Sequence, residues 1–141
     1  MKAVDIEWRA GADRFVARGG SGVPATIDAP RLDPDARPEG PSPSEMLLAA
    51  AGTCSAWDVV EILRKQRQAV ETIDVHVEGD QDADPPWAYR RIRVRFIVRG
   101  TDLDAAQVAR AVRLSESTYC SVIATIRGTA DVVVTCEVTS S

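Results

Sequence analysis

Apolar residues alternate with polar ones in three short stretches near the N-terminus, which begin at Val4, Phe15 and Val23. This period of two is typical of strands that bury one face. Turns at 10–13 and 18–22 separate the stretches, and the glycines of the second turn supply the positive φ angles that tight turns need. The pattern predicts a β-meander in the N-terminal part of the chain.

The next segment is a proline-rich loop followed by a long apolar run. Residues 30–43 hold five of the eight prolines. Ser42, Pro43 and Glu45 predict a helix start, because S-x-x-E is a capping box and proline suits the first helical position. The helix is expected to run to about Arg67. Apolar residues surround its first two thirds, so we expect that part to be buried on nearly all sides.

The C-terminal half returns to alternation and predicts two strands, a pair of helices and a last strand. The strands cover 72–79 and 89–100, the helices 101–117 and 118–128, and the last strand 130–139. The order βββ-α-ββ-αα-β predicts an α+β fold with β-sheets wrapped around a long central helix. A single chain of 141 residues does not easily cover that helix on every side, so we expect an intertwined homodimer.

Composition favours a single domain, residues 1–141, with an aliphatic core, because 45% of residues are hydrophobic and only seven are aromatic. The net charge is −4 without a basic stripe, which argues against a nucleic-acid partner. Arg91, Arg93 and Arg95 alternate with apolar residues, which favours a solvated strand face over a ligand patch. We see no signal-like stretch and no run long enough to cross a bilayer, so we expect a cytoplasmic protein with no membrane partner.

The sequence contains little evidence for a metal site. The three cysteines do not form a C-x-x-C pair, and the single histidine, His76, falls in an alternating strand pattern. A histidine on a strand face is more often structural than a metal ligand. We therefore expect no metal site and no cofactor.

Cys54 lies inside the predicted long helix, among alanines, a glycine and a serine. Small residues permit close packing, so a tightly packed structural thiol is one interpretation. The other is a reactive thiolate with room for a substrate. At 100° per residue, the Cys54 side of the helix mixes an apolar wall with carboxylates: Leu47, Ala50, Ala51, Trp57, Asp58 and Glu61.

Cys120 is expected in the first turn of a helix that Ser117 or Thr118 would cap. Unpaired N–H groups there favour a thiolate, which makes Cys120 the more acidic thiol by this argument. Cys136 falls in an apolar strand and is expected to be an inert core thiol. If Cys54 and Cys120 met, one could attack a peroxide and the other could form a disulfide with it, but the physics leaves open which attacks first.

Two stretches of the chain resemble the OsmC/Ohr family. Residues 41–68, PSPSEMLLAAAGTCSAWDVVEILRKQRQ, are similar to the family's Pro-x-Glu-Leu-Leu…Cys central helix. Residues 110–122, RAVRLSESTYCSV, are similar to its Leu-Ser…Tyr-Cys-Ser/Pro-Val motif. The strand order also matches, so the resemblance covers nearly the whole chain. It implies an OsmC-like fold and an obligate intertwined dimer with its sites at the subunit interface.

The resemblance also implies an activity. Known members are thiol peroxidases that reduce organic hydroperoxides in oxidative stress defence and take reducing power from dithiols such as lipoyl groups. By resemblance, Cys54 is the attacking cysteine, Cys120 the resolving one, and Arg18 the arginine that polarises thiolate and peroxide. We expect an apolar substrate pocket with walls from Leu47, Ala51, Trp57 and the second chain.

One departure from the family pattern concerns the carboxylate that holds the arginine. In the best-studied peroxidases it directly follows the helix-opening proline, where this chain has Ser44, and Glu45 comes one residue later. The capping box already explains Glu45. The pattern resembles a less characterised branch related to YhfA proteins. Two alternatives to the peroxidase therefore stay open: a protein that binds a small ligand or senses redox state without turnover, and a purely structural role for both cysteines.

Overall fold

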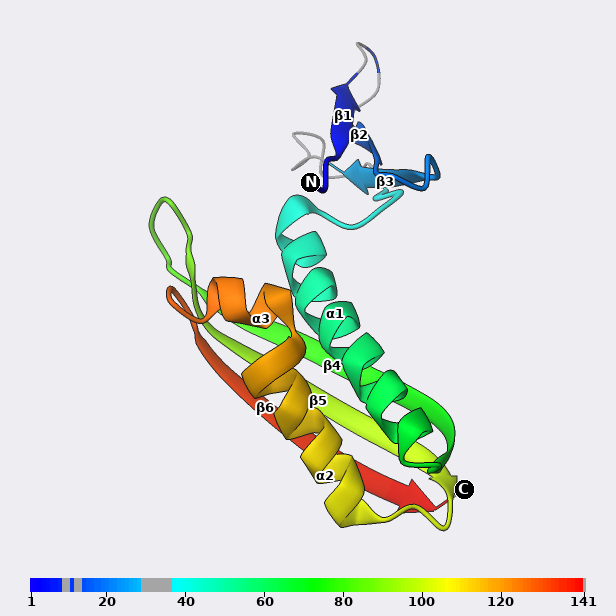
Figure 1. Cartoon of the computed structure of the whole chain (residues 1–141). Coiled ribbons are helices and arrows are strands. Elements are labelled where there is room, and N and C mark those ends of the chain that lie inside the picture. Colours follow the sequence, from blue (N-terminus) through cyan, green and yellow to red (C-terminus); the bar gives the residue numbers. More distant parts are fainter. Residues whose placement is uncertain (9–10, 12–13, 29–36, 141) are drawn as a thin grey trace. The chain divides into compact units, whose positions relative to one another are not determined.

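The computed structural model describes residues 1–8, 11, 14–28 and 37–140. The chain forms two compact units, Met1–Leu47 and Leu48–Ser141, and their boundary falls inside the long helix α1 (Pro43–Lys65). The element order in Figure 1 is the one that the sequence predicts, with one additional helical turn. The α+β fold class is therefore confirmed.

The first unit holds the predicted meander, an antiparallel sheet in the order β1-β2-β3. Its strands are β1 (Asp5–Trp8), β2 (Arg14–Arg18) and β3 (Pro24–Asp28). The turn between β2 and β3 contains Gly22 at φ 72°, whose N–H donates to the carbonyl of Gly19. Most of the predicted turn at 10–13, and residues 30–36 of the proline-rich loop, lie outside the described residues.

The predicted capping box at the start of α1 is confirmed. The backbone N–H and hydroxyl of Ser42 donate to Glu45 Oε2 at 2.7 and 2.8 Å, and the Glu45 N–H donates back to Ser42 Oγ at 3.3 Å. These hydrogen bonds, the backbone one first, hold the pKa of the Glu45 carboxyl below its ordinary value. The cap explains why the helix begins where the proline-rich loop ends.

We expect Ser42→Ala to lower the free energy of unfolding by about 1 kcal/mol, because the cap loses its side-chain oxygen. Ser42→Thr keeps that oxygen and should stay close to the parent. Since the pKa of Glu45 is lowered in the folded protein, the cap stabilises at neutral pH and weakens as pH falls through that pKa. Urea unfolding of both variants at neutral and acidic pH measures this. Equal stability of Ser42→Ala and the parent at neutral pH would contradict the prediction.

The buried residues of α1 form one stripe: Ala51, Gly52, Ser55, Val59 and Leu63. Within the single chain only this stripe is buried and Trp57 keeps 65% of its surface exposed, so burial of α1 on nearly all sides requires a second chain and stays a prediction. The expectation that no run is long enough to cross a bilayer is wrong, since α1 has 23 residues and an apolar composition. Core helices of soluble proteins also reach this length and apolar composition, and the buried stripe of α1 packs against protein.

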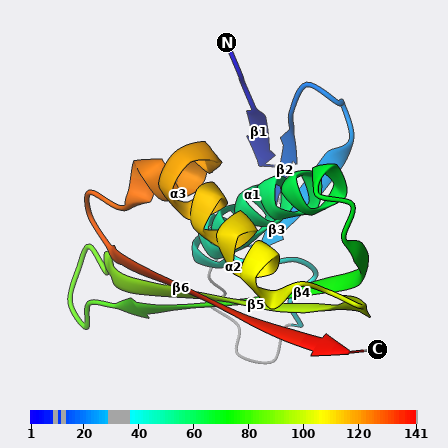
Figure 2. The ribbon, with the colours of Figure 1, turned by 60° about the horizontal axis from the view of Figure 1, so that its bottom comes forward.

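The second unit contains a three-stranded sheet with helices on one face (Figures 1 and 2). β4 (Ala69–Gln81) runs antiparallel to β5 (Tyr89–Thr101), and β6 (Asp131–Ser140) runs parallel to β5. The parallel pairing requires a crossover, which the helices between β5 and β6 supply. The core lies between the sheet and the helices, and its fully buried side chains include Val59, Leu63, Ile92, Val94, Phe96, Val98 and Val108.

Gly52 explains why α1 carries such small residues. A Cβ added at Gly52 would lie 2.7 Å from Val77 Cγ2 and 3.5 Å from Val75 Cγ1, both on β4. The helix therefore approaches the sheet too closely for a side chain at this position. The packing interpretation of the alanine- and glycine-rich stretch is correct for this face of α1.

The opposite face of the sheet carries charge, as the alternating arginines of β5 predict. Each pairs with a carboxylate of a neighbouring strand: Arg91 with Asp131 (3.1 Å), Arg93 with Asp80 (2.8 Å) and Arg95 with Glu137 (3.8 Å). These residues are exposed or half-exposed, as expected for a solvated strand face.

The crossover begins with α2 (Ala105–Leu114), a π-helical turn η1 (Ser115–Tyr119) and α3 (Ser121–Ile126). These helices begin and end at other residues than the predicted ranges, 101–117 and 118–128, for two reasons. Asp104 accepts hydrogen bonds from the N–H groups of Ala106 and Gln107, so α2 begins after it. Cys120 has an extended backbone, with φ −70° and ψ 102°, which separates the π turn from α3.

Candidate functional site

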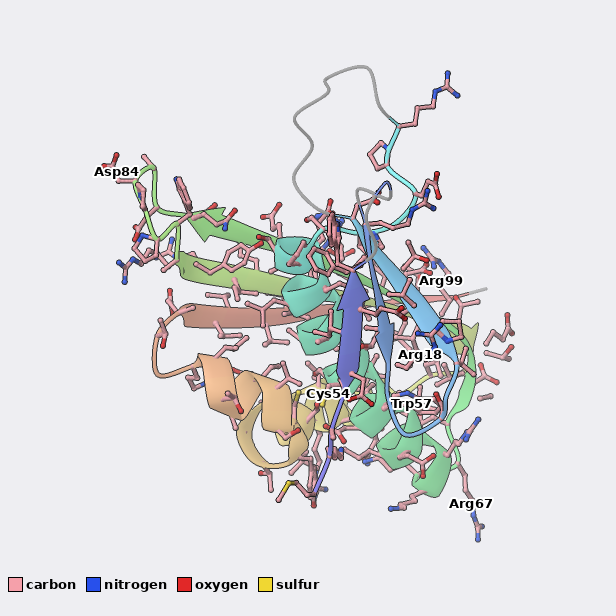
Figure 3. The ribbon with its side chains drawn as sticks, turned by 90° about the horizontal axis from the view of Figure 1, so that it is seen from above. Arg18, Cys54, Trp57, Arg67, Asp84 and Arg99 are labelled. Carbon is pink, nitrogen blue, oxygen red and sulfur yellow. The ribbon has the colours of Figure 1, made fainter. Side chains whose placement is uncertain are left out.

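Cys54 and Trp57 project from the middle of α1 (Figure 3). The Cys54 side chain is partly exposed. Its sulfur lies 3.9 Å from the hydroxyl of Ser121, the first residue of α3. A residue 67 positions away in the sequence therefore contacts the thiol that the sequence singles out.

Cys120 also lies at this site. It is the N-cap of α3, where its sulfur accepts a hydrogen bond from the Ile123 N–H at 3.5 Å, and it keeps only 2% of its surface exposed. Its thiol lies close enough to Cys54 for each to influence the pKa of the other, and both cysteines are free thiols. The structure thus brings together the two sulfurs that the sequence could pair only as a hypothesis.

A buried group of hydroxyls lies next to the two thiols and was not found from the sequence. Ser115 Oγ is 2.9 Å from Ser55 Oγ, 3.1 Å from the Ser55 carbonyl oxygen and 3.0 Å from Asp58 Oδ2. Ser55 and Ser115 are fully buried. The carbonyl of Ser115 also accepts the N–H of Cys120 at 2.9 Å. This network therefore ties the turn before Cys120 to the helix residue after Cys54. In the sequence, the only sign of this hydroxyl network is Ser55, the serine directly after Cys54.

The two thiols differ in acidity. Burial is the largest influence on the pKa of Cys54 and raises it, as the charge of Asp58 also does to a smaller degree. Hydrogen bonds from the Val122 N–H, the Cys120 thiol and the Ser121 hydroxyl together outweigh both, so the pKa of Cys54 lies below its ordinary value.

The neighbouring thiol behaves in the opposite way, because burial raises the pKa of Cys120 to about 11 and the nearby Cys54 adds to the rise. The expectation that Cys120 is the more acidic thiol is therefore wrong. The N–H groups of α3 do reach the Cys120 sulfur and lower its pKa, as the helix-start argument assumes. Desolvation of the buried thiol raises that pKa by more. The electrostatics make Cys54 the more acidic of the two thiols and keep Cys120 protonated at neutral pH.

Three of the predicted site residues belong to the first unit. Arg18 pairs with Glu7 at 3.4 Å, Glu45 is held by Ser42, and Leu47 is exposed. Their roles in catalysis or substrate binding stay predictions. The same holds for Ala51, which is fully buried, and for the exposed Trp57.

A groove of about 540 Å³ lies on the second unit, between the C-terminal half of α1 and the segment that joins α2 to α3. Its lining mixes carboxylates, a lysine and apolar groups: Asp58, Glu61, Ile62, Lys65, Gln66, Leu114 and Tyr119. Asp58 also belongs to the buried hydroxyl network, and Tyr119 precedes Cys120. The groove therefore adjoins the residues that position the thiols.

The remaining cysteine and the histidine lie on the sheet. Cys136 packs against the core from β6, and burial raises the pKa of its thiol. His76 lies on the outer face of β4 with Nε2 3.7 Å from Glu78. Within the described residues, His, Cys, Asp and Glu side chains form no group of three or more that could hold a metal ion.

The sequence and the structure are both similar to known proteins. Residues 35–135 match the family model described as OsmC-like protein. Protein YhfA of Escherichia coli K12 is 42% identical over 117 residues, which are 83% of each chain. A hypothetical protein from Aquifex aeolicus has a TM-score of 0.84 at 27% identity, with 100% of this chain and 98% of that chain covered.

A more distant structure has the same fold. The organic hydroperoxide resistance protein OhrB of Bacillus subtilis superposes with a TM-score of 0.61 at 19% identity, with 97% of this chain and 98% of that chain covered. The family match spans most of the chain, including both cysteine motifs, and YhfA matches over a similar length. This protein, whose two neighbouring thiols differ in acidity, therefore belongs to the OsmC-like protein family.

Proposed function

We propose that this protein is a cysteine-based thiol peroxidase that reduces organic hydroperoxides, with Cys54 as the attacking and Cys120 as the resolving residue. The observation that carries the proposal is the proximity of two free thiols, of which Cys54 is acidified and Cys120 is not. A peroxidase that resolves its own intermediate needs one thiolate to attack and a second thiol within reach.

The chemistry follows from these two roles. The Cys54 thiolate attacks the terminal oxygen of the hydroperoxide, the O–O bond breaks, and the leaving alkoxide takes a proton to become an alcohol. Cys54 is now a sulfenic acid. The Cys120 sulfur attacks the Cys54 sulfur and its proton leaves with the hydroxyl as water, so a disulfide forms. A dithiol such as a lipoyl group then reduces the disulfide by exchange and is itself oxidised.

Family membership supports the proposal, since OhrB of Bacillus subtilis is named for organic hydroperoxide resistance. We further propose that two copies associate through the exposed face of α1, which includes Trp57 at 65% exposure. Contiguous exposed apolar patches mark interaction sites, and Trp57 and Leu47 are the large apolar side chains that α1 exposes. In that cytoplasmic homodimer, Leu47 and Trp57 would line the substrate pocket, and Arg18 would polarise thiolate and peroxide.

The direct test is a stoichiometric addition of cumene hydroperoxide to the reduced protein. We expect rapid loss of two thiols per chain and a Cys54–Cys120 disulfide in the peptide map, while Cys136 stays reduced. A dithiol should restore both thiols and allow turnover. If both thiols persist after an excess of the peroxide, the peroxidase proposal is wrong.

A second candidate is a protein on the same fold that binds a small ligand or senses redox state without turnover. It is favoured by the engagement of Glu45 in the cap of α1, where Ser44 occupies the position of the usual family carboxylate. Slow reaction with peroxide, together with tight retention of an apolar ligand, would support this candidate. Fast, saturable turnover with a lipoyl donor would exclude it.

A further inference from the structure

We propose that Ser121 is a catalytic residue of this site, whose hydroxyl donates a hydrogen bond to the Cys54 thiolate and activates it. The inference rests on the proposed function for its catalytic consequence, while the contact itself is in the structure. The two atoms are 3.9 Å apart, which is within hydrogen-bonding range for sulfur. Sequence reasoning assigned no role to Ser121.

Ionisation of Cys54 determines the direction of this hydrogen bond. While Cys54 is a thiol, either atom can be the donor. A thiolate has no proton and accepts only, so the Ser121 hydroxyl must then donate. A hydrogen bond to an ionised acceptor is stronger than one between neutral groups. Ser121 therefore stabilises the thiolate more than the thiol and increases the reactive fraction at neutral pH.

The other groups at the Cys54 sulfur cannot replace this hydroxyl. Asp58, one turn further along α1, is an anion and opposes ionisation. The Cys120 thiol is also a donor, but resolution converts it into part of the disulfide. The Val122 N–H is a backbone donor that stays in place in every variant. Ser121 is thus the side-chain donor that serves Cys54 and takes no part in the covalent steps.

Local structure holds the backbone of Ser121 in position. Ser121 opens α3, and its carbonyl accepts the Thr125 hydroxyl at 2.7 Å. The N-cap of the same helix is Cys120, whose N–H is bound by the carbonyl of Ser115. The main chain is thus constrained directly before and after the residue whose hydroxyl reaches Cys54 on α1.

The test is the pH profile of Cys54 alkylation by iodoacetamide, followed by peptide mass spectrometry in the reduced parent, Ser121→Ala, Ser121→Thr and Ser117→Ala. In Ser121→Ala, Cys54 should react about 3- to 10-fold more slowly near neutral pH, as expected for one lost hydrogen bond, and reach the parent rate at high pH. Ser121→Thr keeps a hydroxyl and should restore the profile. Ser117 is exposed, and its variant should match the parent.

An unchanged midpoint in Ser121→Ala would overturn the proposal, as would a loss in rate that persists at high pH, because that pattern reports a structural change. Thermal melting of each variant separates a folding defect from a change in thiol acidity. Alkylation uses no peroxide. A shifted profile in a protein that consumes no peroxide would therefore retain the role of Ser121 in thiol activation and reject only the peroxidase function.

Discussion

Cys54→Ser is expected to consume cumene hydroperoxide at least about 10³-fold more slowly than the parent with a dithiol present. A serine hydroxyl stays protonated at neutral pH and is a poor nucleophile, whereas the pKa of Cys54 lies below its ordinary value because donors from α3 and Cys120 outweigh its burial. The parent rate should rise with pH as Cys54 ionises and become constant at a lower pH than for a free thiol. Initial rates of hydroperoxide loss across pH measure both effects.

Cys136→Ser is the matched control, because Cys136 is a thiol on β6 whose pKa is raised by burial. The rate at which Cys136→Ser consumes the hydroperoxide should stay within about twofold of the parent rate. If Cys54→Ser consumed the peroxide as fast as the parent, Cys54 would not be the nucleophile. An equal loss of rate in the two variants would instead indicate a general effect on the fold.

Ser115→Ala is expected to lower the free energy of unfolding by about 1–3 kcal/mol. The variant removes a fully buried hydroxyl with contacts to Ser55 and Asp58, and leaves the buried Ser55 hydroxyl without this partner. Urea unfolding monitored by circular dichroism measures the loss. Ser117→Ala removes an exposed hydroxyl two residues later in the same turn and should change stability by less than about 0.5 kcal/mol.

The double variant Ser55→Ala/Ser115→Ala tests whether the two hydroxyls act as a pair. Removal of both partners leaves fewer buried polar groups unsatisfied than removal of one, so the double variant should lose less than the sum of the single variants. Strict additivity would show that the 2.9 Å contact contributes no coupling energy. Equal stability of Ser115→Ala and the parent would contradict the proposed contribution of the network.

The network of Ser55, Ser115 and Asp58 also explains how the fold positions two thiols of different acidity. Ser55 follows Cys54 on α1, and Ser115 opens the π turn that ends just before Cys120. Short π-helical segments often occur at functional sites, and this one places Cys120 at the start of α3. One buried contact therefore holds the residue after Cys54 against the turn that leads to Cys120.

Much of the local structure could be predicted from the sequence. The capping box at Ser42 and Glu45, the alternation along β5 and the element order are all as expected, because each depends on residues within a few positions of one another. The limits of α2 and α3 were less accurate. Asp104 and Cys120 act as caps, and the sequence pattern alone did not identify them as such.

The sequence by itself determined the family, the two cysteine motifs and the α+β order of elements. Only the tertiary structure decided which thiol is acidic, since this depends on the burial of Cys120 and on donors from α3 that reach Cys54 across 67 positions. It alone revealed the pair of Ser55 and Ser115, which are 60 positions apart. The physical reason is that helix and strand periods record local geometry, whereas desolvation and hydrogen bonding at a thiol depend on which distant segments pack around it.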